Sequence, residues 1–309
     1  MKFSQTSNQI LMVRPACFGF NPETAASNSF QKTSDGMTAE AISAQAIEEF
    51  DAVVDTLMAC QIDVFVVEDT PQPPKTDAVF PNNWISFHQS GIAVTYPMMS
   101  ENRRHEVRED VLEDLVEHFA IDEVWRMERE SGDACLEGTG SMVLDRQKRI
   151  AYACRSPRTD EGLFNQFCQR LDYQPFLFDA VYSDGIPVYH TNVIMTVTEK
   201  LMIVCLESIA DETQREELKK TALDRGKTIL ELSLKQVGQF AGNMLQIGDP
   251  EERPMLVMSK SARASLNVDQ ITILEDESDV LAVSIPVIEK HGGGSLRCML
   301  AELFVPVRD

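Results

Sequence analysis

Apolar and polar positions repeat in the same order along the chain, and the order is clearest in its middle part. Two short apolar runs, residues 141–144 and 150–154, are joined by a polar turn and predict a β-hairpin. Apolar side chains then recur every fourth position from Leu163 to Leu171, which indicates an amphipathic helix. An apolar run at residues 175–178 predicts another strand. The pattern therefore predicts a unit of two strands, a helix and a third strand.

The same order recurs in three further stretches and, in divided form, at the two ends of the chain. The three stretches are residues 84–127, 193–232 and 244–285, with helices expected near residues 107–115, 211–225 and 261–266. The divided unit joins a strand at 11–13, a helix carrying Ile47, Phe50, Val54 and Leu57, and a strand at 64–67 to a C-terminal strand at 299–305. Repeated units pack against their neighbours, and joining the two ends closes a ring. We therefore expect one α/β domain, residues 1–309, built as a five-bladed pseudo-symmetric propeller.

Five residues with reactive or polar side chains mark equivalent points of these units. Asn83, Glu137, His190, Asn243 and Cys298 are separated by 54, 53, 53 and 55 positions, and each stands just before or at the start of an apolar run. Equivalent positions come together in space when repeated units close into a ring. The spacing therefore predicts that an acid, an imidazole, two amides and a thiol meet near one axis.

Composition narrows the classes of function. The 309 residues are 43% apolar, enough to bury a large core, and the net charge of −21 argues against a nucleic-acid partner, which needs clustered Lys and Arg. We find no signal-peptide pattern and no apolar run long enough to span a bilayer, so we expect a soluble cytoplasmic protein without a membrane partner. Seven scattered cysteines without a CxxC pair make a disulfide framework or a zinc site unexpected. Assembly into a homo-oligomer stays open.

Motifs around the marked residues resemble those of the pentein, or amidinotransferase-like, superfamily over nearly the whole chain. The segments are Leu136-Glu137-Gly138, Ser156-Pro157-Arg158-Thr159, His190-Thr191-Asn192 and Gly292-Gly293-Gly294-Ser295-Leu296-Arg297-Cys298. The resemblance implies the propeller fold and an active site with no metal and no cofactor.

The predicted nucleophile is Cys298, because the three glycines let the backbone approach closely and a thiolate beside an imidazole is a strong nucleophile. The alternative is an inert core cysteine, which its residue type alone favours. His190 is expected to transfer protons, with Glu137 fixing its tautomer and raising its pKa. The alternative for His190 is a buried histidine without a catalytic role. His291, beside the glycines, is a weaker candidate for the pocket lining.

The segment from Asp77 to Asn83 departs from guanidine-modifying relatives such as arginine deiminase and dimethylarginine dimethylaminohydrolase. The resemblance implies acidic residues at the corresponding positions of those relatives, where they hold the guanidinium. This chain has Asn82, Asn83 and Asn192 at these positions. A carboxylate suits a cation, whereas an amide, with donors and an acceptor, suits a neutral ureido group. Ordinary turn chemistry is the alternative for these asparagines.

The remaining candidates concern the rest of an amino-acid substrate. Arg158 matches the position that binds the α-carboxylate in relatives, unless it is a surface arginine. Asp77 is expected to bind the α-ammonium group, or else to cap a loop. Arg14 and the loop at residues 21–28 are candidates for a substrate lid.

The resemblance is closest to citrulline utilization hydrolase, also called citrulline ureidase. It implies that Cys298 attacks the ureido carbon of citrulline and that water resolves the covalent intermediate to ornithine, ammonia and carbon dioxide. Two alternatives stay open. One is a deiminase or hydrolase of arginine or methylated arginine within the same superfamily, and the other is a non-catalytic scaffold with the same fold.

Overall fold

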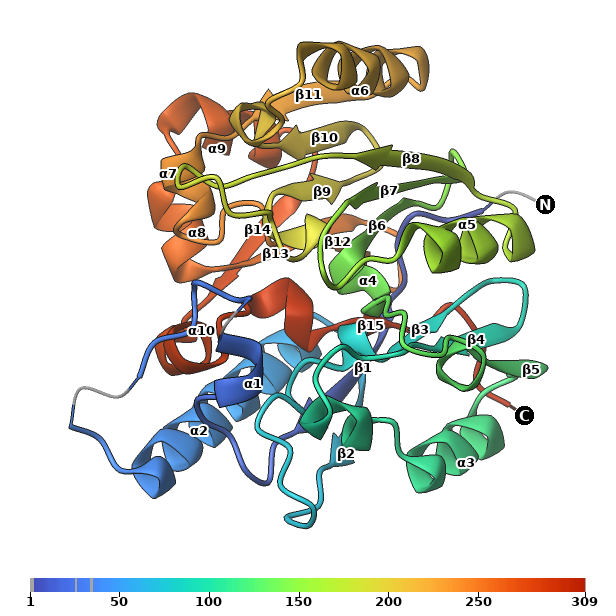
Figure 1. Cartoon of the computed structure of the whole chain (residues 1–309), viewed down its shortest axis with the longest axis vertical. Helices are drawn as coiled ribbons and strands as arrows, with labels where there is room; N and C mark the ends of the chain where they lie inside the picture. The colour runs from blue at the N-terminus through green and yellow to red at the C-terminus, as the bar shows by residue number, and fades with distance from the viewer. Residues whose placement is uncertain (1–2, 26, 34–35, 309) are drawn as a thin grey trace.

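Five three-stranded sheets form the centre of the molecule in the computed structural model, which describes residues 3–25, 27–33 and 36–308 (Figure 1). The sheets are β15 (Ala301–Glu302), β1 (Gln9–Arg14) and β2 (Asp63–Glu68); β3 (Ile85–Phe87), β4 (Ile92–Thr95) and β5 (Glu123–Arg126); β6 (Met142–Asp145), β7 (Ile150–Cys154) and β8 (Gln174–Phe178); β9 (Met195–Val197), β10 (Leu201–Val204) and β11 (Thr228–Glu231); and β12 (Leu245–Gly248), β13 (Pro254–Ser259) and β14 (Asp279–Val283).

All five sheets share one pairing pattern. The first strand runs antiparallel to the second, and the second runs parallel to the third. An antiparallel pair needs only a tight turn, whereas a parallel pair needs a crossover, and here each crossover contains a helix. The expected five units of strand, strand, helix and strand are confirmed, including the one divided between the chain ends. The first strands of different sheets also contact one another: β15 contacts β3, and β9 contacts both β6 and β12. Closure of the whole ring stays a prediction.

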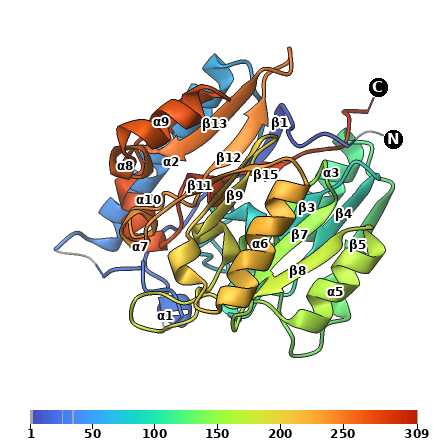
Figure 2. The ribbon, with the colours of Figure 1, turned by 90° about the horizontal axis from the view of Figure 1, so that it is seen from above.

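Amphipathic helices cover the outside of the sheets (Figure 2). They are α2 (Ala39–Ala59), α3 (Glu109–His118), α5 (Glu161–Arg170), α6 (Glu212–Asp224), α8 (Lys260–Ser265) and α9 (Val268–Glu275). Short helices and turns complete the described chain: α1 (Pro22–Ala25), α4 (Gly138–Ser141), α7 (Leu234–Val237), α10 (Pro286–Gly292), η1 (Pro81–Asn83), η2 (Asn102–Glu106), η3 (Met127–Arg129), η4 (Thr191–Val193), η5 (Leu206–Ser208) and η6 (Leu296–Met299). None of the helices in the described part is long and apolar enough to cross a membrane.

Several predicted boundaries change. The single helix expected near 261–266 is two helices, because the side chain of Asn267 caps α9 by accepting from Gln270 N. The strand expected at 299–305 is reduced to the two residues of β15, because η6 includes Met299 and residues 303–305 form no strand. Val107 precedes α3 rather than belonging to it.

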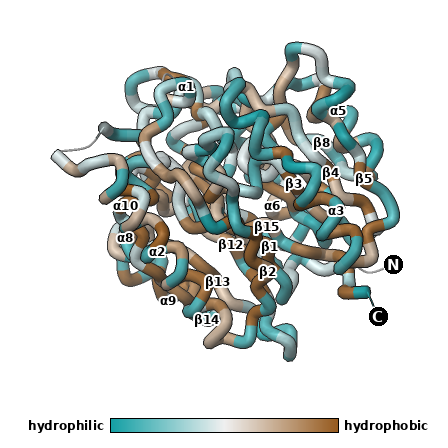
Figure 3. The backbone as a smooth tube through the Cα atoms, turned by 90° about the horizontal axis from the view of Figure 1, so that it is seen from below, coloured by the Kyte–Doolittle hydropathy of each residue, from teal (hydrophilic) through white to brown (hydrophobic). Residues whose placement is uncertain are grey.

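The buried core lies between the strands and the inner faces of the helices. On α2 the fully buried positions are Ile42, Ala46, Phe50, Val53 and Leu57, so the buried stripe is shifted by one position from the predicted one at Ile47 and Val54. The tube coloured by hydropathy shows apolar strands such as β13 beside more polar outer helices (Figure 3). Most of α6 faces away from the core, because only Leu218 and Ala222 of that helix are buried.

Short helical turns precede the first strands of the sheets and position the five marked residues. Asn83 ends η1, Glu137 and His190 stand at the N-caps of α4 and η4, and Cys298 lies in η6. Asn243 follows a backbone turn just before β12. These turns bring side chains from distant parts of the sequence to one end of the central strands.

Candidate active site

One small cavity collects most of the predicted site residues. Cys298, His190, Asn83, Asp77 and Arg158 all line it. The other lining residues are Thr24, Asn28, Gln31, Phe80, Arg103, Tyr189, Gly292, Gly293 and Gly294. Its volume is about 10 Å³, roughly the space of one water molecule. The residues are therefore assembled around a very small space.

The Cys298 sulfur contacts two amide groups. Asn243 Nδ2 lies 3.3 Å and Asn192 Nδ2 lies 3.5 Å from Sγ. Amide N–H groups pointing at sulfur can stabilise the negative charge that it carries as a nucleophile. The polar surroundings fit a reactive thiol better than an inert one, and the role of Cys298 stays a prediction.

His190 and Glu137 form a buried hydrogen-bonded pair, with 2.8 Å between Nε2 and Oε2. Burial alone would raise the pKa of Glu137, but Arg158 and His190 outweigh it and hold that pKa well below its usual value. An ionised Glu137 requires the proton on Nε2 of His190, which leaves Nδ1 with a lone pair. Glu137 raises the pKa of His190 as expected, but burial outweighs this contribution and the net shift is downward. Burial lowers the pKa of His190 to about 4, assisted by Arg158 and Arg103, although Glu137 opposes the shift.

Gly140 leaves the space that the histidine ring occupies. A Cβ at this position would lie 2.8 Å from both Cε1 and Nδ1 of His190 and would also collide with the amide nitrogen of Asn83. Real Cβ contacts are essentially never below 3.0 Å. A glycine in α4 is therefore a condition for placing His190 and Asn83 side by side.

Two arginines connect the carboxylates of the site. Arg158 is 1% exposed, so the surface alternative is wrong, and its Nη1 donates to Glu137 Oε2 at 3.2 Å. Arg103 was not anticipated from the sequence. It donates to Asn83 Oδ1 at 3.0 Å, forms a bidentate pair with Glu106 and lies 3.6 Å from Asp77. Burial raises the pKa of Glu106 to about 7, even though Arg103 opposes the shift.

The amides and Asp77 take different places around the cavity. Asn83 Nδ2 donates to Asn82 Oδ1, so Asn82 stands behind Asn83 and does not line the cavity. Asn192 Oδ1 is buried and has no hydrogen-bond partner among the described residues. Asp77 accepts from Asn21 Nδ2 at 2.7 Å, and burial raises its pKa. Its carboxylate accepts no backbone N–H in the described part of the chain, which does not support the loop-cap alternative.

The predicted lid segment covers the cavity. Within residues 21–28, of which residue 26 lies outside the described ones, the carbonyl of Thr24 and the hydroxyl of Ser27 accept from Arg158. Asn28, its last residue, and Gln31, just beyond it, donate to the carbonyls of Gly293 and Gly292. We call residues 28–32 the strap.

Two further sequence candidates are not part of the cavity. Arg14 forms a bidentate pair with Asp51 on α2 and does not line the cavity, so its assignment to the lid is wrong. His291 is buried, but its Nδ1 contacts the carbonyl of Lys32 instead of the cavity.

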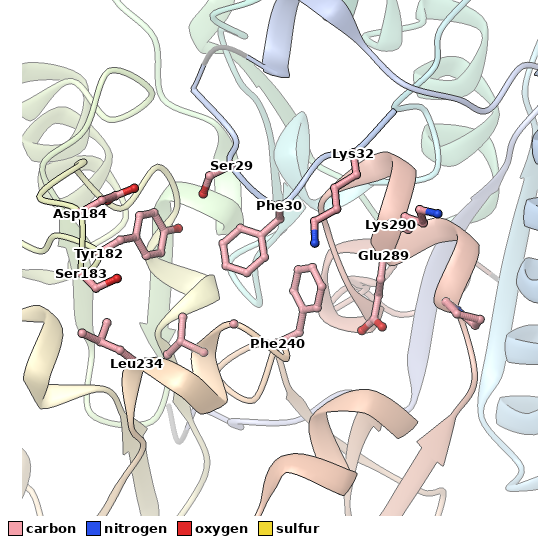
Figure 4. Close-up of a pocket in the computed structure, with 13 residues that line it drawn as sticks. Ser29, Phe30, Lys32, Tyr182, Ser183, Asp184, Leu234, Phe240, Glu289 and Lys290 are labelled. Carbon is pink, nitrogen blue, oxygen red and sulfur yellow. The ribbon is translucent and has the colours of Figure 1, made fainter. Parts of the chain in front are cut away.

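A larger cavity of about 620 Å³ is also lined by residues of the strap (Figure 4). Ser29, Phe30 and Lys32 line this second cavity, whereas Asn28 and Gln31 line the first. The ring of Phe30 packs against Phe240, with 4.9 Å between centroids. Different residues of the strap thus line the two cavities.

Comparison with known proteins identifies the family. The model of the family described as "N,N dimethylarginine dimethylhydrolase, eukaryotic" matches residues 14–305. The chain belongs to this dimethylarginine dimethylhydrolase family. No curated protein sequence matches the chain. Within the part of this family member that the structure describes, no group of three or more His, Cys, Asp or Glu side chains could hold a metal ion.

Solved structures support the same fold for the family member. The arginine dihydrolase ArgZ, from the ornithine–ammonia cycle in cyanobacteria, is 15% identical with a TM-score of 0.75, covering 97% of this chain and 41% of its own. Its N-terminal domain, solved as a cysteine-to-serine variant bound to substrate, is 16% identical with a TM-score of 0.74. The match covers 96% of this chain and 99% of that domain. A dimethylarginine dimethylaminohydrolase variant with an S-methyl-L-thiocitrulline adduct is 17% identical with a TM-score of 0.66, covering 96% of this chain and 99% of its own. This chain thus spans less than half the length of full-length ArgZ, and these likenesses support the shared fold.

Proposed function

We propose that this protein is a cytoplasmic hydrolase of the ureido group of citrulline, with Cys298 as nucleophile. The observation that carries the proposal is the chemistry around the sulfur. The side chains that contact Sγ are the neutral amides of Asn192 and Asn243. The cavity carboxylate Asp77 and the carboxylate behind His190, Glu137, already lie beside Arg103 and Arg158. A guanidinium would therefore meet no uncommitted counter-charge at the reacting end, whereas a neutral ureido group needs none.

The chemistry proceeds in two steps. The sulfur forms a bond to the ureido carbon, and the bond from that carbon to the ornithine nitrogen breaks. The thiol proton passes through His190 Nδ1 to the departing amine, leaving an S-carbamoyl thioester on Cys298. Water then attacks the carbonyl carbon and releases the thiol and carbamate, which decomposes to ammonia and carbon dioxide. Arg158 and Asp77 are proposed to bind the α-carboxylate and the α-ammonium group of the substrate.

The second candidate is hydrolysis of arginine or a methylated arginine. It is favoured by the family model and by solved relatives named arginine dihydrolase and dimethylarginine dimethylaminohydrolase. This reaction requires the amides to hold a cation that has left water. A buried cation without a counter-charge costs several kcal/mol, and about 1.4 kcal/mol corresponds to a factor of ten. We therefore expect a preference for citrulline of roughly a hundredfold or more.

The deciding experiment supplies the purified protein with citrulline, arginine or dimethylarginine at equal concentration and measures ornithine, citrulline and ammonia. We expect ornithine with one ammonia from each citrulline and little product from the cations. Faster consumption of arginine would overturn the proposal and favour the second candidate. No turnover of any of these compounds would favour the non-catalytic scaffold.

Two variants test the reason for the preference. Asn192→Asp adds a carboxylate beside Sγ, so it should reduce citrulline turnover and improve arginine binding. Asn83→Asp should change selectivity less, because Arg103 already faces Asn83 and would neutralise the new charge. The exposed Asn165→Asp on α5 makes the same charge change away from the site and serves as the control.

A further inference from the structure

A further cavity with no role in the proposed reaction, lined by charged and aromatic side chains, lies at the opposite end of the strands from Cys298. It is formed after β3 and in the turn between β6 and β7, whereas the active-site residues precede those strands. Its volume is about 180 Å³. Three arginines line it, Arg146, Arg149 and Arg170, with Asp172 as the acidic side chain of the lining. Such a convergence of cations is unusual in a chain with a net charge of −21.

The three guanidinium groups differ in their existing partners. Arg146 lies 3.5 Å from Glu302, and Arg170 pairs with Glu123. Arg149 instead donates to the backbone carbonyls of Leu171 and Asp172, and within the described part of the chain it forms no ion pair. Its guanidinium carbon lies 3.8 Å from the centre of the Tyr173 ring and 4.1 Å from that of Phe3. Arg149 is thus held in place while its charge stays uncompensated.

A buried histidine provides an independent indication of a ligand. His88 lines the cavity and is 4% exposed. Its Nε2 lies 2.9 Å from Ser86 Oγ, which lies 2.6 Å from the hydroxyl of Tyr96. Its Nδ1 has no hydrogen-bond partner among the described residues. Buried polar atoms are almost always hydrogen-bonded, so an unpartnered one calls for a group that is not part of the chain.

We propose that this cavity binds a small oxyanion, a phosphate or carboxylate group that Arg149 and Arg170 hold and that accepts a hydrogen bond from His88 Nδ1. Guanidinium groups bind both kinds of anion through paired N–H donors. The ring of Tyr173 supports the guanidinium of Arg149 from one side. The cavity is large enough for inorganic phosphate or a small dicarboxylate and too small for a nucleotide. This site is separate from the proposed citrulline site and does not depend on it.

The first test measures thermal unfolding and titration calorimetry of the full chain with inorganic phosphate, malonate or sodium chloride at matched ionic strength. A ligand that binds only the folded state raises the melting temperature, and the rise grows with the ratio of ligand concentration to Kd. We expect phosphate or malonate to raise the melting temperature more than chloride does. The anion that gives the larger increase identifies the preferred ligand. Equal effects of all three salts would overturn the proposal.

Matched variants locate the binding. Arg149→Gln and, separately, Arg170→Gln should weaken anion affinity at least tenfold. Lys148→Gln removes the same charge from an exposed position in the same turn and should change affinity less than twofold. Arg170 is exposed at the end of α5, so its variant keeps the test usable if Arg149→Gln does not fold. Unchanged affinity in the Arg170 variant, or equal losses in all three, would contradict the assignment.

A spectroscopic measurement follows the histidine directly. In protein labelled with ¹⁵N-histidine, anion addition should shift the Nδ1 resonance of His88 in the wild type and not in Arg149→Gln or Arg170→Gln. The resonances of the exposed His105 and His118 serve as internal controls for ionic strength. A His88 signal that does not respond to a bound anion would overturn the assignment.

Discussion

Cys298 is distinguished from the other buried cysteines by the two amide nitrogens at its sulfur. Replacing a small buried thiol by serine or alanine changes little volume, so the fold should survive the substitution. We predict that Cys298→Ser and Cys298→Ala abolish citrulline turnover while the melting temperature stays within a few degrees. The half-buried Cys60→Ala should retain full activity. Substantial hydrolysis by the alanine variant would restore the inert-core interpretation of Cys298.

Arg158 has two functions in the proposed site, because it contacts Glu137 as well as the cavity. Loss of the predicted α-carboxylate contact should raise KM for citrulline by a factor corresponding to about 2–4 kcal/mol. Loss of the contact with Glu137 should in addition lower kcat, since Glu137 holds the tautomer of His190. We therefore predict that Arg158→Ala changes both parameters, whereas Arg155→Ala, an exposed neighbour, changes neither. Steady-state kinetics with unchanged KM would remove Arg158 from substrate binding.

The sequence was sufficient to find the residues whose spacing follows the repeat. Cys298, His190 and Asn83 line one cavity as expected, and Asn243 reaches the sulfur. Arg103 could not be found in this way, because it lies in a charged stretch between repeat positions that resembles a solvated surface. Its importance arises from tertiary contacts with Asn83 and Asp77, which no local pattern encodes.

At the scale of elements, the short turns before the first strands determine how closely the site residues approach one another. Gly140 in α4 is the tightest of these places. We predict that Gly140→Ala lowers kcat/KM for citrulline at least a hundredfold, because the added methyl displaces the His190 ring or the Asn83 amide. Gly162→Ala in α5 is the matched control, since its Cβ would meet only a side-chain oxygen of Asp160 at 3.1 Å. Normal activity in Gly140→Ala would mean that the ring tolerates displacement.

The repeat of strand, strand, helix and strand was readable because apolar periodicity changes sharply between strands and amphipathic helices. The boundaries of helices and strands were harder to predict where helical turns or side-chain caps satisfy the backbone hydrogen bonds. Met299, the first residue of the expected strand, instead ends the helical turn η6, which brings Cys298 to the cavity. The helix pair α8 and α9 was missed because the capping residue Asn267 lies inside the apparent loop.

At the scale of the whole molecule, the burial of the site sets its response to pH. Burial lowers the pKa of His190 to about 4, from an ordinary value of 6.5. The unfolded chain therefore takes up this proton at a higher pH than the folded one. The contribution of His190 to stability is complete above pH 6.5 and is lost as the pH falls through about 4.

The same shift predicts the acidic limb of activity. A neutral His190 can accept the thiol proton, so kcat/KM for citrulline should hold down to about pH 5 and fall below it, instead of falling near 6.5. Circular dichroism at each pH separates loss of activity from unfolding. Burial also raises the pKa of Glu106 to about 7, so the profile of Glu106→Gln should be recorded beside that of the wild type. An acidic limb near 6.5 that persists in this variant would contradict the assignment.

The strap has a kinetic consequence. The cavity beside Cys298 holds about one water molecule, and hydrogen bonds from Asn28 and Gln31 to the glycine carbonyls hold the strap against it. If the proposed substrate enters past the strap, these bonds must break, so each cycle of the proposed reaction would contain an opening event whose frequency sets an upper limit on turnover. Reclosure would isolate the acylated sulfur from cellular thiols and amines. A thioester that could otherwise carbamoylate other molecules would then be released only by the water enclosed with it.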